Sequence, residues 1–194
     1  MKLDGMVAYA LRHIEPTRDQ AGAPAYRCAA YLKDGLYLPC VLLRAAVPQV
    51  DLALRRFAET ATQEERNEQD RKNFLRRLFA SGIPFGLAAI VKTFVATGNR
   101  VSSWHLDRIE PSPFALPVAR LKEIQGETSM GWTQFVGVMD DGKSFAFGTT
   151  HHTEFFQMPP GYTAMDVDRI IPGETVVGPT YRERPFFECF IDEA

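Results

Sequence analysis

Two Asp-Gly dipeptides constrain the fold of this chain more than any other sequence feature. Asp34-Gly35 and Asp141-Gly142 each lie between two runs rich in aromatic and branched residues. Gly adopts a positive φ without steric cost, and Asp tolerates it better than most residues, so the pair favours a tight turn between antiparallel strands. The sequence therefore predicts two hairpins, over residues 26–43 and 131–156.

A two-residue turn at each dipeptide also predicts the register of each hairpin. Cys28 then faces Val41 in the first hairpin, and Val136 faces Phe147 in the second as part of one apolar face. Pro39 has no N–H to donate to a neighbouring strand, so we expect its nitrogen at a sheet edge or at a β-bulge.

Residues 49–80 carry the helical pattern of the chain. Val50, Leu54 and Phe57 recur at helical spacing, and residues 62–65 have the pattern of a capping box. A second apolar stripe follows near the end of the segment. We expect a helical segment here that packs on the predicted sheet.

Three further segments favour strands. Residues 87–109 are typical of another hairpin, around Gly98-Asn99, and residues 185–191 form an aromatic run, the final predicted strand. Residues 5–14 are apolar, and we favour a strand over a short helix there. The prediction is an α+β fold, made mainly of antiparallel β-hairpins that form a sheet or a partly open barrel.

The length of 194 residues favours a single domain over residues 1–194. A proline-rich connector over 111–117 makes two lobes, 1–110 and 118–194, the alternative. The two Asp-Gly hairpins also resemble each other. Because hairpins look alike, convergence is the simpler explanation and duplication the alternative.

Composition narrows the class of protein. The net charge of −2 gives no overall field that would attract nucleic acid or an anionic membrane. Three cysteines without a CxxC pair argue against a disulfide scaffold or a structural zinc site. The longest apolar run, 83–91, is interrupted by Pro84 and Gly86, whereas a membrane helix needs about 20 apolar residues. We expect a soluble, cytoplasmic protein that does not enter the membrane.

His152 and Glu154 form the cluster with the most chemical potential. On the predicted strand they project from the same face, about 6.5–7 Å apart along the chain. Imidazole and carboxylate suit a divalent metal such as Zn²⁺, Fe²⁺ or Mn²⁺. His105 is the candidate third ligand, with Glu127 and His13 as alternatives. The opposing interpretation is structural, with the pair on an exposed sheet surface.

A basic group lies near the end of the predicted helical segment. It consists of Arg71, Lys72, Arg76 and Arg77, around Phe74. Such a group can contact phosphates or nucleic acid. Acidic residues precede it, however, and acids at the start of a helix with bases at its end are typical of a solvated helix, because they complement the helix dipole.

We therefore expect a non-enzymatic binding or protein-interaction module, with a protein as the first candidate partner. One alternative is a metal-dependent enzyme or a small-ligand-binding β-barrel centred on His152 and Glu154. The other is nucleic-acid binding through the basic residues 71–77. The sequence leaves enzymatic activity, a divalent metal cofactor and the oligomeric state open.

Overall fold

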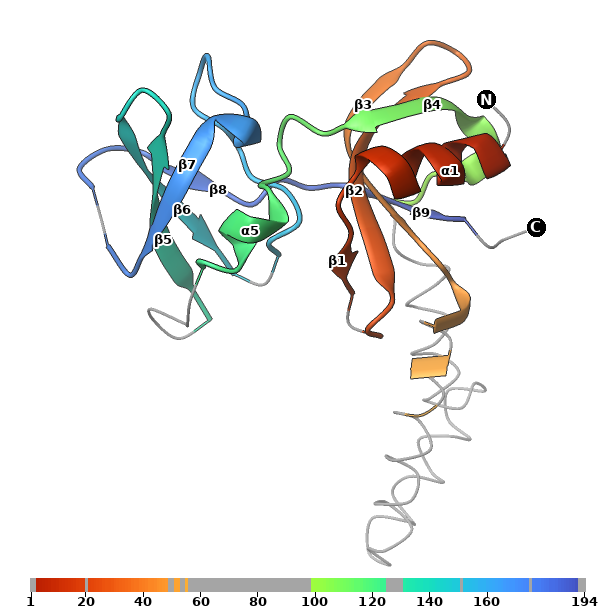
Figure 1. Ribbon diagram of the computed structural model, residues 1–194, viewed down its shortest axis with the longest axis horizontal. Helices are drawn as coiled ribbons and strands as arrows, with labels where there is room; N and C mark the ends of the chain where they lie inside the picture. The colour runs from red at the N-terminus through yellow and green to blue at the C-terminus, as the bar shows by residue number, and fades with distance from the viewer. Residues whose placement is uncertain are drawn as a thin grey trace, which may run out of the picture.

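The computed structural model describes residues 3–19, 21–48, 51–52, 55, 99–124, 131–150, 152–174 and 176–191. Within these residues, two mixed β-sheets lie side by side, and neither closes on itself (Figure 1). The helix α1 (Leu3–His13) packs on the first sheet, and the short helix α5 (Val118–Leu121) contacts the second. The α+β class is confirmed at this level, because the described residues are rich in β-sheet and contain few helices.

The first sheet has five strands: β1 (Thr17–Arg18), β2 (Pro24–Leu32), β3 (Tyr37–Arg44), β4 (Leu106–Pro111) and β9 (Phe187–Phe190). β2 pairs with β3 along one edge, and β1 and β4 share its other edge. These pairings are antiparallel. β9, from the end of the chain, runs parallel to β3 at the outer edge.

The second sheet has four strands: β5 (Thr133–Met139), β6 (Ser144–Thr149), β7 (Val167–Pro172) and β8 (Thr180–Arg182). β5 lies between β6 and β7 and is antiparallel to both. β8 runs parallel to β6 at the edge. Short 3-10 helices, η1 (Ser103–His105) and η2 (Ala164–Asp166), come directly before β4 and β7.

The helix α1 covers residues 5–13 of the segment 5–14, so the preference for a strand was wrong. Met6, Ala10 and Ile14 recur every four residues and are buried against the first sheet. That spacing lines one face of a helix, whereas a strand would place alternate residues on one face. Asp4 in the first turn and Arg12 in the last also complement the helix dipole.

Two other predicted elements fall largely outside the described residues. Of the helical segment 49–80, only residues 51, 52 and 55 are described, and they are helical. Of the predicted hairpin 87–109, the first strand lies outside the described residues. The second strand begins only at Leu106, after η1, and its described partner is β2.

Both Asp-Gly turns are one residue longer than predicted. The backbone N–H of Leu32 donates to the carbonyl of Leu36, and that of Met139 to Lys143, both at 2.8 Å. Each loop therefore has three residues, with its glycine last and at positive φ, +90° for Gly35. This is a type I turn followed by a glycine in the left-handed region, a common hairpin loop.

The longer loop shifts the register of the second hairpin by one residue. Val136 faces Ala146, and Phe135 faces Phe147, so the predicted pairing of Val136 with Phe147 was wrong. The Phe135 and Phe147 rings lie nearly parallel, with their centroids 5.5 Å apart. A shift by one position moves every side chain to the opposite face, which is why the apolar face differs from the prediction.

The first hairpin corrects the same shift with a β-bulge. Tyr31 pairs with Tyr37 next to the loop, but the register changes between Cys28 and Ala30. Beyond this irregularity, Cys28 faces Val41 as predicted. Pro39 lies on the opposing strand at the bulge, where its missing N–H costs no ladder hydrogen bond.

Two consecutive phenylalanines join the sheets. Phe155 is fully buried and packs with Leu42 on the face of the first sheet that α1 does not cover. Phe156 is fully buried in the core of the second sheet, edge-on to Phe135 and Phe147. The chain between β6 and β7 therefore contributes one aromatic ring to each core.

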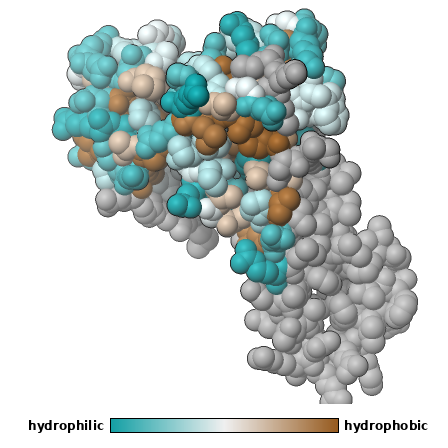
Figure 2. Space-filling model, turned by 45° about the vertical axis from the view of Figure 1, so that its right-hand side comes forward, coloured by the Kyte–Doolittle hydropathy of each residue, from teal (hydrophilic) through white to brown (hydrophobic). Residues whose placement is uncertain are grey.

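The described surface shown in Figure 2 is mainly hydrophilic, with hydrophobic residues gathered in a band near the middle of that face. None of the helices among the described residues is long and apolar enough to cross a bilayer.

Candidate ligand-binding groove

A cavity of about 440 Å³ lies beside the segment that connects β8 of the second sheet to β9 of the first. Figure 1 shows this segment running between the two sheets. Residues 183–186 of this segment supply most of the described lining, together with Glu188 of β9, Asn99 and His152. Cavities of this size, with a few converging polar groups, are typical of small-ligand sites. We call it the inter-sheet groove.

Backbone hydrogen bonds hold the connecting segment in place. The N–H of Arg184 donates to the carbonyl of Phe155 at 2.8 Å, and the N–H of Glu188 donates to Asn99 at 2.7 Å. The Phe186 ring packs against Phe155, with centroids 5.5 Å apart. These contacts therefore fix the position of the backbone that carries the neighbouring polar side chains.

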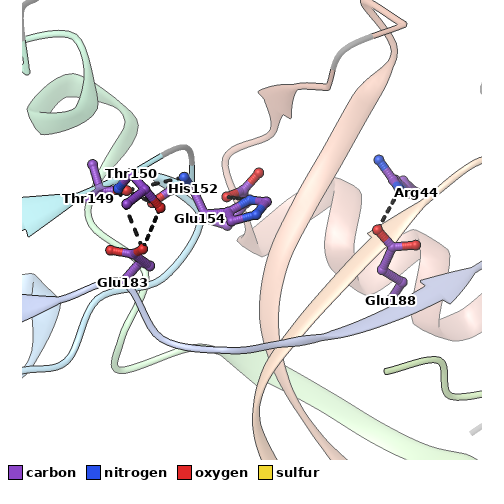
Figure 3. A network of polar contacts seen from close by, with 7 residues as sticks. All are labelled: Arg44, Thr149, Thr150, His152, Glu154, Glu183 and Glu188. Atoms are coloured by element: carbon purple, nitrogen blue, oxygen red, sulfur yellow. Dashed lines mark hydrogen bonds and ion pairs between the residues drawn. The ribbon is translucent and has the colours of Figure 1, made fainter. Parts of the chain in front are cut away.

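Glu183 contributes an ionised carboxylate to the groove. Its Oε1 accepts hydrogen bonds from the hydroxyl of Thr150 at 2.8 Å and from the Thr150 N–H at 3.4 Å (Figure 3). Burial alone would raise the pKa of Glu183, but these hydrogen bonds and the charge of Arg182 outweigh it, so the pKa lies below its ordinary value. Glu183 is therefore charged at neutral pH.

Glu188 contributes a second carboxylate, from β9. Its Oε1 lies 2.5 Å from Nη2 of Arg44 in a largely buried ion pair (Figure 3). Within the described part of the chain, no hydrogen-bond donor reaches the other oxygen of Glu188 or of Glu183, and both of these Oε2 atoms are buried. Two carboxylates thus line the groove, and each keeps one buried oxygen without a partner among the described residues.

His152 and Glu154 lie together, but not on a strand as predicted. β6 ends at Thr149, whose hydroxyl accepts from the His152 N–H and donates to the His152 carbonyl, so the chain turns there. His152 Nδ1 lies 3.5 Å from Glu154 Oε2, with the imidazole more than half exposed at the groove. Figure 3 shows the two side chains next to each other.

His105 does not join this pair. It lies exposed in η1, where its carbonyl accepts a hydrogen bond from the Lys33 N–H. Among the described residues, no three His, Cys, Asp or Glu side chains gather closely enough to hold a metal ion. The structure thus brings together two of the three predicted ligands. Glu127 falls outside the described residues.

Arg27 is a buried charge that sequence reasoning missed. It lies on β2 and is only 4% exposed, and burial lowers its pKa to about 10, although the charges of Glu154 and Glu15 oppose this shift. It therefore stays protonated at neutral pH. Among the described groups, no acceptor bonds to its Nε or Nη1. The sequence signal that could have revealed this buried charge is an arginine in the middle of an apolar strand.

The cysteines of the hairpin are not poised for catalysis. Cys28 and Cys40 are buried in the first sheet. Burial raises the pKa of Cys28 far above its ordinary value and that of Cys40 to about 11. Since the thiolate is the nucleophile, neither thiol is activated at neutral pH.

The basic residues that were predicted to contact nucleic acid all lie outside the described residues. They are Arg71, Lys72, Arg76 and Arg77. That hypothesis therefore stays a prediction.

Thr150→Val is expected to raise the pKa of Glu183, because it removes the hydroxyl donor and keeps the backbone one. A carboxylate whose folded pKa is depressed stabilises the protein above its unfolded pKa, and this contribution disappears as the pH falls through the folded value. The variant should therefore lose more stability at pH 7 than at pH 3. NMR titration of the Glu183 carboxyl carbon measures the shift. Thr180→Val, at an exposed position of β8, is the control and should leave the pKa unchanged.

Comparison with known proteins found no match to this chain among protein-family models, curated proteins or solved structures.

Proposed function

We propose that this protein is a non-enzymatic binding protein that takes a small ligand in the inter-sheet groove. The observation that carries the proposal is that Glu183 and Glu188 both line one cavity and that each has a buried carboxylate oxygen, Oε2, without a donor among the described residues. A buried acceptor without a donor costs about 1–3 kcal/mol, and more when it is charged. A ligand that reaches these oxygens, which are closed to water in the free protein, and supplies the donors recovers this free energy.

The groove also indicates the chemistry of the ligand. Ionised carboxylates only accept hydrogen bonds, so the ligand must donate. Phe186 adds an aromatic ring beside the same cavity, and such a ring attracts a cation at its face. A small cation with two or more N–H donors, such as an amine or a guanidine, fits these requirements.

The other predicted functions have weaker support. A metal-dependent reaction at His152 and Glu154 needs a third ligand, and the described residues bring none to the pair. Binding of a protein partner stays a prediction, because no observation of the described surface distinguishes a partner from a small ligand.

Isothermal titration calorimetry with putrescine and agmatine tests the proposal. We expect saturable binding of at least one of them. The double substitution Glu183→Gln with Glu188→Gln should weaken that binding by about tenfold or more, because each charged hydrogen bond contributes about 1.5–3 kcal/mol. Glu174→Gln, at an exposed site, is the matched control.

Binding of acetate but of neither cation would contradict the proposal. So would cation binding that the double substitution leaves unchanged, because the site would then lie elsewhere.

A further inference from the structure

We infer that this chain is a tandem duplication of one three-stranded unit, and that the two copies exchange chain: the segment after β4 packs in the second sheet, and the last strand, β9, packs in the first. The first copy consists of β2, β3 and β4, and the second of β5, β6 and β7. This inference is independent of the proposed ligand.

The hairpin turns of the two copies are built in the same way. Asp34 Oδ1 accepts from the Leu36 N–H at 3.0 Å, and Asp141 Oδ1 accepts from the Lys143 N–H at 3.1 Å. Each turn closes the same three-residue loop with a glycine at positive φ. Turn chemistry of this kind recurs by convergence, so on its own it is weak evidence for duplication.

The third strands pair with the hairpins in one and the same register. Pro111 of β4 faces Cys28, and Pro172 of β7 faces Phe135, at equivalent positions of the two hairpins. Both ladders then shift once, at the last pair before the loop, where Leu106 faces Leu32 and Val167 faces Met139. Hairpin geometry alone does not require the third strands of two hairpins to share the same register and the same shift next to the loop.

The sequences of these third strands agree as well. Ser-Ser-Trp-His-Leu-Asp-Arg-Ile-Glu-Pro over residues 102–111 matches Thr-Ala-Met-Asp-Val-Asp-Arg-Ile-Ile-Pro over 163–172 at Asp, Arg, Ile and Pro without a gap. β4 and β7 have the same order of buried and exposed residues, and each follows a 3-10 helix. The carbonyls of His105 and Asp166, which end these helices, each accept from a loop N–H at 2.9 Å.

After the third strand, the two copies follow different paths. In the second copy, the chain continues into β8, which joins its own sheet beside β6. In the first copy, the chain crosses to the other sheet: the Pro113 carbonyl accepts from the Ala164 N–H at 2.7 Å, and Leu116 is buried in the second core. The place beside β3 that corresponds to β8 is taken by β9, from the end of the chain.

Figure 1 shows both connections, one after β4 and one between β8 and β9, running between the sheets. The first sheet is thus completed by β9, which follows the second copy's third strand, and the second core contains Leu116, which follows the first copy's third strand. Because each core contains residues delivered by a crossing segment, neither copy can lose its packing without disturbing the other. The two sheets should therefore unfold in one cooperative transition.

The chain carries separate probes for the two copies. All three cysteines lie in the first sheet, and Trp132 lies next to β5 in the second. In a Trp104→Phe variant, Trp132 fluorescence reports on the second copy alone, and pulsed labelling with a thiol reagent reports on the first. We expect equal urea midpoints for the two signals. Leu116→Ala, in the crossing segment, should lower both midpoints together, and a shift of the Trp132 signal alone would overturn the exchange.

A graft tests the duplication itself. Residues 102–111 are replaced by the sequence of residues 163–172, and in a control by that of residues 164–173, which displaces the pattern by one position. We expect the aligned graft to keep a single cooperative transition with a midpoint well above that of the displaced graft. Equal loss of stability in the two grafts would overturn the equivalence of the third strands.

Discussion

Phe155→Ala is expected to lower the free energy of unfolding by about 3–5 kcal/mol, the usual cost of removing a fully buried phenylalanine. Phe155 has no exposed surface and packs with Cys40 and Leu42 of the first sheet and with Phe186 of the segment between β8 and β9. The ring therefore supports the first core and the wall of the inter-sheet groove together.

Urea unfolding monitored by circular dichroism measures this loss. Phe155→Leu keeps an apolar side chain of similar volume and should cost less than about 1.5 kcal/mol. Trp104→Ala removes a large aromatic ring from a position that is 61% exposed, and we expect a change within about 0.5 kcal/mol. A loss below 1 kcal/mol for Phe155→Ala would mean that this segment does not pack between the sheets.

Gly148→Ala is expected to cost about 1–3 kcal/mol, or more, through overpacking. A Cβ built on Gly148 would lie 2.0 Å from Cζ2 of Trp132, well inside van der Waals contact. The indole cannot move freely, because the Arg182 guanidinium lies over its ring, 4.7 Å from the centroid. The backbone of Gly148 has no positive φ, so the cost comes from the contact and not from strain.

A double-mutant cycle separates this clash from other effects. In a Trp132→Ala background the indole is absent, and Gly148→Ala should then be neutral or slightly stabilising, because alanine loses less conformational entropy than glycine on folding. Thermal or urea unfolding of the four proteins gives the coupling free energy. Equal costs of Gly148→Ala in the two backgrounds would show that Trp132 does not cover this glycine.

The inter-sheet groove illustrates why a candidate site of this kind cannot be found by a motif search. Glu183 and Glu188 lie on either side of a short connection, with no spacing that signals a ligand. His152 is close to Glu154 in the chain, and this local pair was predicted. His152 lies near Glu183 because β8 pairs in parallel with β6. This pairing depends on residues far apart in the sequence.

Local chemistry accounts for what the sequence could predict. The two Asp-Gly turns and the hairpins around them follow from the φ preferences of glycine and aspartate, which act over a few residues. The bulge beside Pro39 follows from its missing N–H in the same way. The helix at residues 3–13 was ambiguous, because a short apolar run suits a strand or a helix until its buried face is known.

The sequence by itself determined that this chain forms two antiparallel hairpins, and where each one reverses. Tertiary structure alone decided that the loops have three residues, that Phe135 pairs with Phe147, and that the end of the chain returns to the first sheet. The physical reason is range: turn preferences depend on neighbouring residues, whereas register and strand partners depend on which apolar surfaces are buried together across the whole chain.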